Sequence, residues 1–144
     1  RDVLAAQAAG ADLAYMGTRF LATEESLVSE AYREMIVGSG AEQIVYTPSI
    51  STIPANFLRE SIVAAGLDPD HLPVPDKVDL GHVTNPHAEE STQSGPAPKA
   101  WKEVWSAGQS VAGIDSVVPV AELVDRLEAE YTQAKGELLA VIGE

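Results

Sequence analysis

Apolar positions recur with helical spacing at the two ends of the chain. The Ala-rich run DVLAAQAA at residues 2–9 predicts a helix that ends at Gly10. From Pro119 to about Ile142, apolar residues return at three- and four-residue steps and form one stripe. This pattern predicts a long amphipathic helix, which Gly136 weakens near its end.

Short apolar and β-branched runs between these helices predict strands. Residues 12–16, DLAYM, follow the first helix after a single turn, and IVYT at residues 44–47 is rich in strand-forming residues. A helix, a glycine and a strand in close succession are typical of an α/β fold.

Two further helices are predicted between and after these strands. Thr23 is a good N-cap residue, and Glu24 and Glu25 would complement the dipole of a helix that ends near residues 38–40. The run PANFLRESIVAAG at residues 54–66 predicts a second helix, which begins near its Pro or Asn and stops at its last Gly.

The chain changes character after residue 67. Residues 68–99 contain most of the prolines and all three histidines with little periodicity, so we expect a long loop. AWKEVWSAGQSVAGI then predicts a short amphipathic turn of helix followed by a glycine-rich loop. We therefore divide the chain into residues 1–67, the Pro-rich loop 68–99, and residues 100–144.

Composition narrows the classes of partner. A net charge of −13 over 144 residues disfavours nucleic acids and anionic membranes, so an anionic ligand must be held by local N–H groups and helix dipoles. The absence of cysteine excludes disulfides and Cys-ligated zinc. No apolar run approaches the roughly 20 residues that span a bilayer, and no signal peptide is visible, so we expect a cytoplasmic protein. The chain enters a helical pattern directly at Arg1, which we interpret as a fragment or a trimmed chain.

Gly17 and Thr18 stand between the strand predicted at 12–16 and the next helix. Glycine lets a ligand approach the main chain, and successive N–H groups at the end of a strand can form an anion cradle. In (β/α)8 barrels, phosphate sites commonly follow the last strands. An ordinary turn explains the same residues, and spacing alone leaves both interpretations open.

Longer motifs carry a resemblance to a known family. RDVLAAQAAGADLAYMGTRFLATEES resembles the end of the flavin-binding barrel in the nitronate monooxygenase family, formerly called 2-nitropropane dioxygenases. The similarity continues through IVYTPSISTIPANFLRESIVAAGLDPD and returns at AWKEVWSAGQSVAGID and PVAELVDRLEAEY. The resemblance implies the C-terminal portion of a (β/α)8 TIM-type flavoprotein barrel, with its last strand at residues 12–16 and C-terminal helical additions.

The resemblance also implies which residues hold FMN. The phosphate is implied to bind to one segment, which consists of Tyr15, Met16, Gly17 and Thr18. Its main contacts are implied to be with the backbone of Gly17 and Thr18. A second segment, SAGQS, becomes a candidate for lining the flavin site: Ser106, Gly108 and Gln109. Without the resemblance, a helix C-cap at Gly108 followed by a surface turn is the better interpretation of the second segment.

The implied activity is FMN-dependent oxidation of alkyl nitronates by molecular oxygen. The family's catalytic base is a histidine that lies upstream of Arg1, so we assign no catalytic residue within this chain and expect the fragment itself to be inactive. Two alternatives stay open: an NAD(P)H-dependent quinone or enoyl-thioester reductase of the same superfamily, and a non-catalytic binding module.

Other conspicuous side chains are interpreted structurally. Arg19 is expected to pair with a carboxylate rather than with phosphate. Trp101 and Trp105 are four residues apart, so we expect them to share a helix face and to serve in packing rather than in flavin stacking. The histidines lack regular ligand spacing, so they are interpreted as solvated loop residues and not as metal ligands: His71, His82 and His87.

Overall fold

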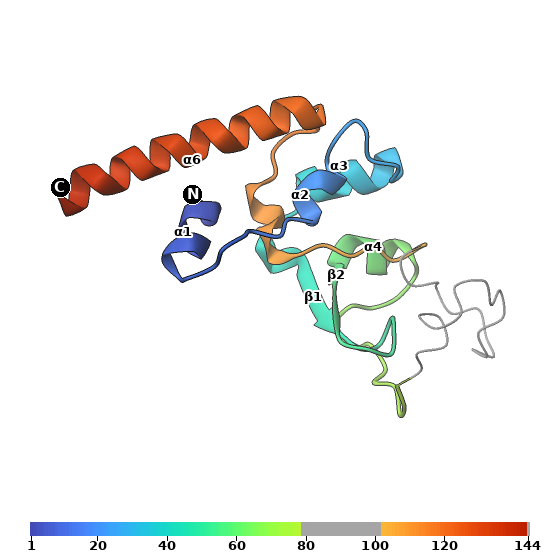
Figure 1. The fold of residues 1–144 in the computed structure, drawn as a ribbon. Coiled ribbons are helices and arrows are strands. Elements are labelled where there is room, and N and C mark those ends of the chain that lie inside the picture. The colour runs from blue at the N-terminus through green and yellow to red at the C-terminus, as the bar shows by residue number, and fades with distance from the viewer. Residues whose placement is uncertain (79–101, 144) are drawn as a thin grey trace.

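The computed structural model describes residues 1–78 and 102–143, which fold as helices around one two-stranded sheet (Figure 1). The described elements in chain order are α1 (Asp2–Ala8), α2 (Thr18–Leu21), α3 (Glu30–Gly38), the 3-10 helix η1 (Ala41–Gln43), β1 (Ile44–Thr47), β2 (Ala55–Leu58), α4 (Arg59–Ala64), the 3-10 helix η2 (Gln109–Gly113) and α6 (Val120–Ile142). The two strands do not close a barrel within this part of the chain.

The β1–β2 hairpin separates two hydrophobic clusters. Its strands are antiparallel, with Ile44 opposite Leu58 and Thr47 opposite Ala55. Successive side chains of a strand point to opposite faces, so Phe57 and Leu58 enter different clusters. Phe57 packs with Ile50, Ile62 and Val104. Leu58 packs with Ala22, Ile36, Ala107, Val111 and Ile114.

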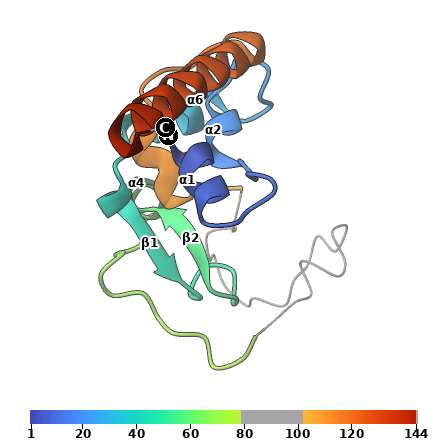
Figure 2. The ribbon, with the colours of Figure 1, turned by 60° about the vertical axis from the view of Figure 1, so that its left-hand side comes forward.

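The long helix α6 confirms the predicted amphipathic stripe. It lies along one side of the molecule, with α1 beside its C-terminal half (Figures 1 and 2). The Tyr131 hydroxyl contacts Gln7 Oε1 at 2.7 Å, and Arg1 pairs with Glu137 at 2.6 Å. Among the described residues, no helix has both the length and the apolar character needed to cross a membrane.

The prediction of a strand at residues 12–16 is wrong, because the structure has no strand there. The segment has no regular secondary structure, and the side chains of Leu13 and Tyr15 are 89% and 100% exposed. A strand needs a partner for its backbone N–H and C=O groups, and no other described segment pairs with this one.

The predicted helix over residues 54–66 is wrong in its first half. Residues 55–58 form β2 because they pair with β1, and the helix begins only at Arg59. Gly66 has a φ of +81° directly after this helix, which confirms the predicted stop.

Thr23 does not cap the following helix. It is buried, and its hydroxyl donates to the carbonyl of Phe20 at 2.8 Å. The helix α3 begins at Glu30, where the Ser29 hydroxyl accepts a backbone hydrogen bond as N-cap. Its end at Gly38 agrees with the predicted stop near residues 38–40.

The predicted helical turn after residue 100 is wrong where the structure describes it. Residues 102–107 lie beside β2 without helical structure: Ser106 forms a bridge with Phe57, and the Trp105 carbonyl accepts from the backbone N–H of Leu58 at 2.8 Å. A backbone held by a strand cannot also make helical hydrogen bonds. Residues 68–78 have no helix or strand, as predicted, and the rest of the predicted loop lies outside the described residues.

Glu25 caps a helix that is distant in sequence. Its carboxylate oxygens accept from the backbone N–H of Val120, the first residue of α6, at 2.9 and 3.1 Å. We expect Glu25→Ala to lower the free energy of unfolding by about 1 kcal/mol, since a cap hydrogen bond and a favourable dipole interaction are lost. Chemical denaturation measures this, with Glu24→Ala as the matched control. Equal stability of the two variants would contradict the capping role.

Candidate functional site

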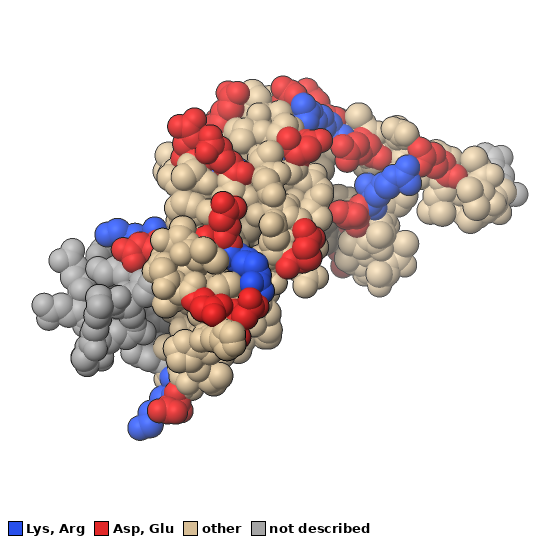
Figure 3. All heavy atoms as spheres, turned by 180° about the vertical axis from the view of Figure 1, so that it is seen from behind, with Lys and Arg blue, Asp and Glu red and all other residues tan. Residues whose placement is uncertain are grey.

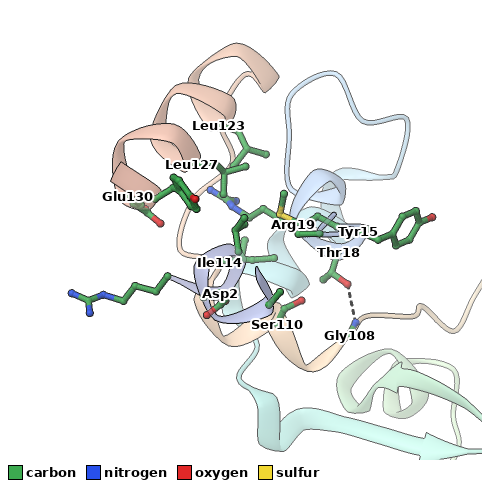
Figure 4. A pocket seen from close by; sticks show the side chains of 18 of the residues that line it. Asp2, Tyr15, Thr18, Arg19, Gly108, Ser110, Ile114, Leu123, Leu127 and Glu130 are labelled. Atoms are coloured by element: carbon green, nitrogen blue, oxygen red, sulfur yellow. Dashed lines mark hydrogen bonds between the residues drawn. The ribbon is translucent and has the colours of Figure 1, made fainter. Parts of the chain in front are cut away.

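A cavity of about 730 Å³ lies between α1, the segment leading into α2, η2 and α6 (Figure 4). This volume is within the range of small-molecule sites. Ile114, Leu123 and Leu127 contribute apolar side chains to the lining. Thr18 and Gly108 lie at one side of the cavity and Glu130 at the other (Figure 4).

The segment at residues 15–18 lines this cavity throughout. Gly17 has a φ of −104°, which any residue can adopt, and a Cβ added there would meet no described atom within 4 Å. Neither the backbone conformation nor the packing of the described residues therefore requires glycine at position 17. The space beside its main chain is open to a ligand. The ring of Tyr15 is fully exposed and points away from the cavity, so only the backbone of this residue can serve the site (Figure 4).

One hydrogen bond joins the two segments that the sequence singled out. The backbone N–H of Gly108 donates to Thr18 Oγ1 at 2.8 Å, although the residues are 90 positions apart (Figure 4). Because the hydroxyl accepts here, its own proton stays available for another acceptor. A Cβ added at Gly108 would stand 3.4 Å from Thr18 Oγ1, which is an ordinary van der Waals contact, so this approach does not by itself require glycine.

The structure brings most, but not all, of the predicted site residues to the cavity. The lining contains Tyr15, Met16, Gly17, Thr18 and Gly108. Ser106 and Gln109 do not line it. Gln109 is exposed at the start of η2. The Ser106 hydroxyl oxygen is buried without a hydrogen-bond partner in the described part of the chain. Gly108 is the N-cap residue of η2, so the alternative of a helix C-cap at this position is wrong.

Arginines and carboxylates both line the cavity. Two of its arginines are engaged by acids: Arg1 by Glu137 and Arg126 by Glu122, each at 2.6 Å. Arg19 instead donates to the backbone carbonyl of Ser116 at 3.3 Å. The described residues give Arg19 no ion pair, so the predicted carboxylate partner is not observed there.

Negative charge surrounds this arrangement. The Ser116 hydroxyl donates to Asp115 at 2.7 Å and holds the pKa of that cavity-lining carboxyl below its usual value. Acidic side chains also spread over the face of the molecule opposite to that in Figure 1 (Figure 3). Arg19 donates to the carbonyl next to Asp115, and the charges of Arg126 and Arg19 lower the pKa of the Asp115 carboxyl further.

Sequence reasoning missed the contributions of α1 and α6 to the cavity. Asp2 and Val3 of α1 and Leu123, Leu127 and Glu130 of α6 line it. The apolar stripe of α6 was visible in the sequence, but periodicity alone does not say what a stripe faces.

The remaining candidates behave as structural residues where they are described. His71 is exposed and pairs with Asp68 at 2.7 Å, which confirms a solvated loop histidine. The other two histidines lie outside the described residues. Trp105 stacks on Tyr32 with ring centroids 4.9 Å apart and an interplanar angle of 15°. Trp101, predicted to share a helix face with Trp105, lies outside the described part.

Comparisons with known proteins give this α/β chain its family. The family model for nitronate monooxygenase matches residues 1–130, and the chain belongs to that family of oxidoreductases. It is 34% identical over 139 residues to nitronate monooxygenase of Paraburkholderia phytofirmans, covering 94% of this chain and 36% of the relative. It is 31% identical over 110 residues to a probable nitronate monooxygenase of Staphylococcus saprophyticus, covering 76% and 30%. The chain thus spans about a third of the length of these relatives.

Solved structures support the fold. A mutant of FabK from Thermotoga maritima matches with a TM-score of 0.66 and 25% identity, covering 96% of this chain and 40% of that one. FabK itself, from the same organism, matches with a TM-score of 0.61 and 23% identity, covering 95% and 42%. The described helices and hairpin therefore recur as part of a larger α/β protein.

Proposed function

We propose that the natural protein containing this chain is an FMN-dependent nitronate monooxygenase that oxidises alkyl nitronates with molecular oxygen. Residues 1–144 would supply the C-terminal part of its (β/α)8 barrel. The family match over residues 1–130 supports the reaction class. The hydrogen bond from Gly108 to Thr18 supports the assignment of the site, because it joins one residue from each segment implied to hold FMN, and both residues line one cavity.

The groups around this hydrogen bond fit a phosphate. The first backbone N–H groups of α2 have no partner within the helix, and they lie beside the Thr18 hydroxyl. Arg19, the next residue, lines the same cavity and donates to the carbonyl of Ser116. All of these groups are donors, and phosphate oxygens are acceptors. The backbone of Gly17 and Thr18 would bind the phosphate of FMN, and Arg19 would balance its charge.

The chain's own residues bind and orient the cofactor in this proposal. FMN, when bound, supplies the electron-transfer chemistry. Leu123, Leu127 and Ile114 line the same cavity and would exclude water from it. Among the described residues no histidine lines the cavity, and the proton-transfer step would belong to the histidine that the family resemblance places upstream of Arg1. The exposed amide of Gln109 and the Ser106 hydroxyl remain candidates for the flavin rim.

The experiment that tests this function is direct. The natural protein is purified, its cofactor is released and identified chromatographically, and oxygen uptake is followed after addition of an alkyl nitronate. We expect FMN as the cofactor and nitronate-dependent oxygen uptake that needs no NAD(P)H.

A different outcome would assign a different function. Oxidation of NAD(P)H with a quinone or an enoyl thioester, without nitronate turnover, would make the protein a reductase of the same superfamily. A purified protein without flavin would overturn the proposal and favour a binding module.

A further inference from the structure

A tyrosine on α3 holds the loop that reaches the candidate phosphate site. Tyr32 is half-buried, and its hydroxyl donates to the backbone carbonyl of Ser106. Its ring stacks on Trp105, the preceding residue of the loop, at a centroid distance of 4.9 Å. Tyr32 thus fixes two successive residues of the loop through two different kinds of contact.

The strand β2 and the start of α4 hold the same loop from the other direction. The Trp105 carbonyl accepts from the N–H of Leu58 at 2.8 Å, and the Trp105 N–H donates to Ser61 Oγ at 2.9 Å. These contacts fix Trp105, and Ser106 forms a bridge with Phe57 of β2. The main chain then continues through the buried Ala107 to Gly108. The Tyr32 hydroxyl therefore makes the hydrogen bond nearest to Gly108 from the α3 side.

The side chain of Ser106 does not share this task. Its hydroxyl oxygen is buried and has no hydrogen-bond partner among the described residues. Its carbonyl is fixed by the Tyr32 hydroxyl, and burial raises the pKa of that hydroxyl, so it stays a donor at neutral pH. Removing the Tyr32 hydroxyl would leave the Ser106 carbonyl without this donor. Ser106 lies two residues before Gly108, whose N–H donates to Thr18.

We propose that Tyr32 is a positioning residue for the cofactor site: it sets the place of Gly108 against Thr18 through the carbonyl of Ser106. The inference rests on the proposed function, because the effect is exerted on the FMN phosphate side of the cavity. Tyr32 itself does not line the cavity, so it acts through the loop and not by contact with the ligand.

The test compares Tyr32→Phe with Tyr46→Phe in the natural protein. Tyr32→Phe keeps the ring that stacks on Trp105 and removes only the hydroxyl. Tyr46 is an exposed residue of β1 and serves as the matched control. We expect Tyr32→Phe to raise the Kd for FMN about 3- to 10-fold, as for the loss of one hydrogen bond, and to change the visible circular dichroism of the bound flavin. Tyr46→Phe should change neither.

A double-mutant cycle separates positioning from a general structural role. Thr18→Val removes the acceptor of the Gly108 N–H. If Tyr32 acts through this hydrogen bond, Tyr32→Phe should raise the Kd much less in the Thr18→Val background than in the wild type. All Kd values are measured well below the unfolding transition of each variant, so that loss of folded protein does not enter them.

The outcomes separate the two proposals. A wild-type Kd and flavin spectrum in Tyr32→Phe, or fully additive effects in the cycle, would overturn the inference and leave the proposed function standing. A wild-type natural protein that binds no FMN would overturn the proposed function, and the inference with it.

Discussion

Residues 1–144, purified alone and supplied with FMN, are expected to show no turnover of an alkyl nitronate. The histidine base that the family resemblance implies is not among these residues, and losing a general base typically costs about 10²–10⁴ in rate. The segment at residues 12–16 also has no strand partner in the described structure and exposes Leu13 and Tyr15. The backbone that should cradle phosphate is therefore poorly supported in the isolated chain, which should weaken FMN binding as well.

Oxygen uptake measures this expectation. The Paraburkholderia phytofirmans nitronate monooxygenase, of which the chain covers 36%, is the positive control under identical conditions. Turnover by the chain within about tenfold of that relative would show that the catalytic base lies within residues 1–144.

Gly17→Val is expected to raise the Kd for FMN in the natural protein by more than about tenfold, which corresponds to about 1.4 kcal/mol. A branched side chain would occupy the space in which the phosphate must approach the main chain. The structure makes this a test of ligand exclusion alone. The φ of Gly17 is −104°, and an added Cβ would meet no described atom within 4 Å, so the fold itself should accept valine.

Gly38→Val is the matched control for this variant. Gly38 ends α3, has no described atom within 4 Å of an added Cβ, and does not line the cavity. Cofactor titration with Gly38→Val should give the wild-type Kd. A Gly17→Val protein that is folded and carries a normal complement of FMN would remove Gly17 from the phosphate site.

The parts of the fold that depend on local sequence could be predicted. The helices α1 and α6 follow from Ala-rich composition and from an apolar stripe, and both are observed within one or two residues of their predicted ends. β2 could not be predicted in this way. Residues 55–58 precede a helix without a break and are strand only because β1 lies beside them. The N-cap prediction at Thr23 was wrong for a related reason, because its hydroxyl donates to the carbonyl of Phe20 instead of capping a helix.

The candidate site was indicated by motifs and not by geometry. The resemblance identified residues 15–18 and Gly108, which the structure places at one cavity. It could not indicate that Ser106 does not line that cavity, because the position of Ser106 depends on the pairing of the loop with β2. Nor could it find Tyr32, whose contact with the loop spans 74 positions in the sequence. Contacts of this kind depend on tertiary packing and leave no local pattern.

The hydrogen bonds of Trp105 to Ser61 and Leu58 fix the start of the loop that leads to Gly108. The bond between Ser61 and Trp105 joins residues 44 positions apart. The entropy of closing a flexible loop grows only with the logarithm of its length, so doubling the length costs about 0.6 kcal/mol. An insertion between Leu72 and Val104, which both pack in the cluster of Phe57, should therefore cost little stability and leave the distance from Gly108 to Thr18 unchanged.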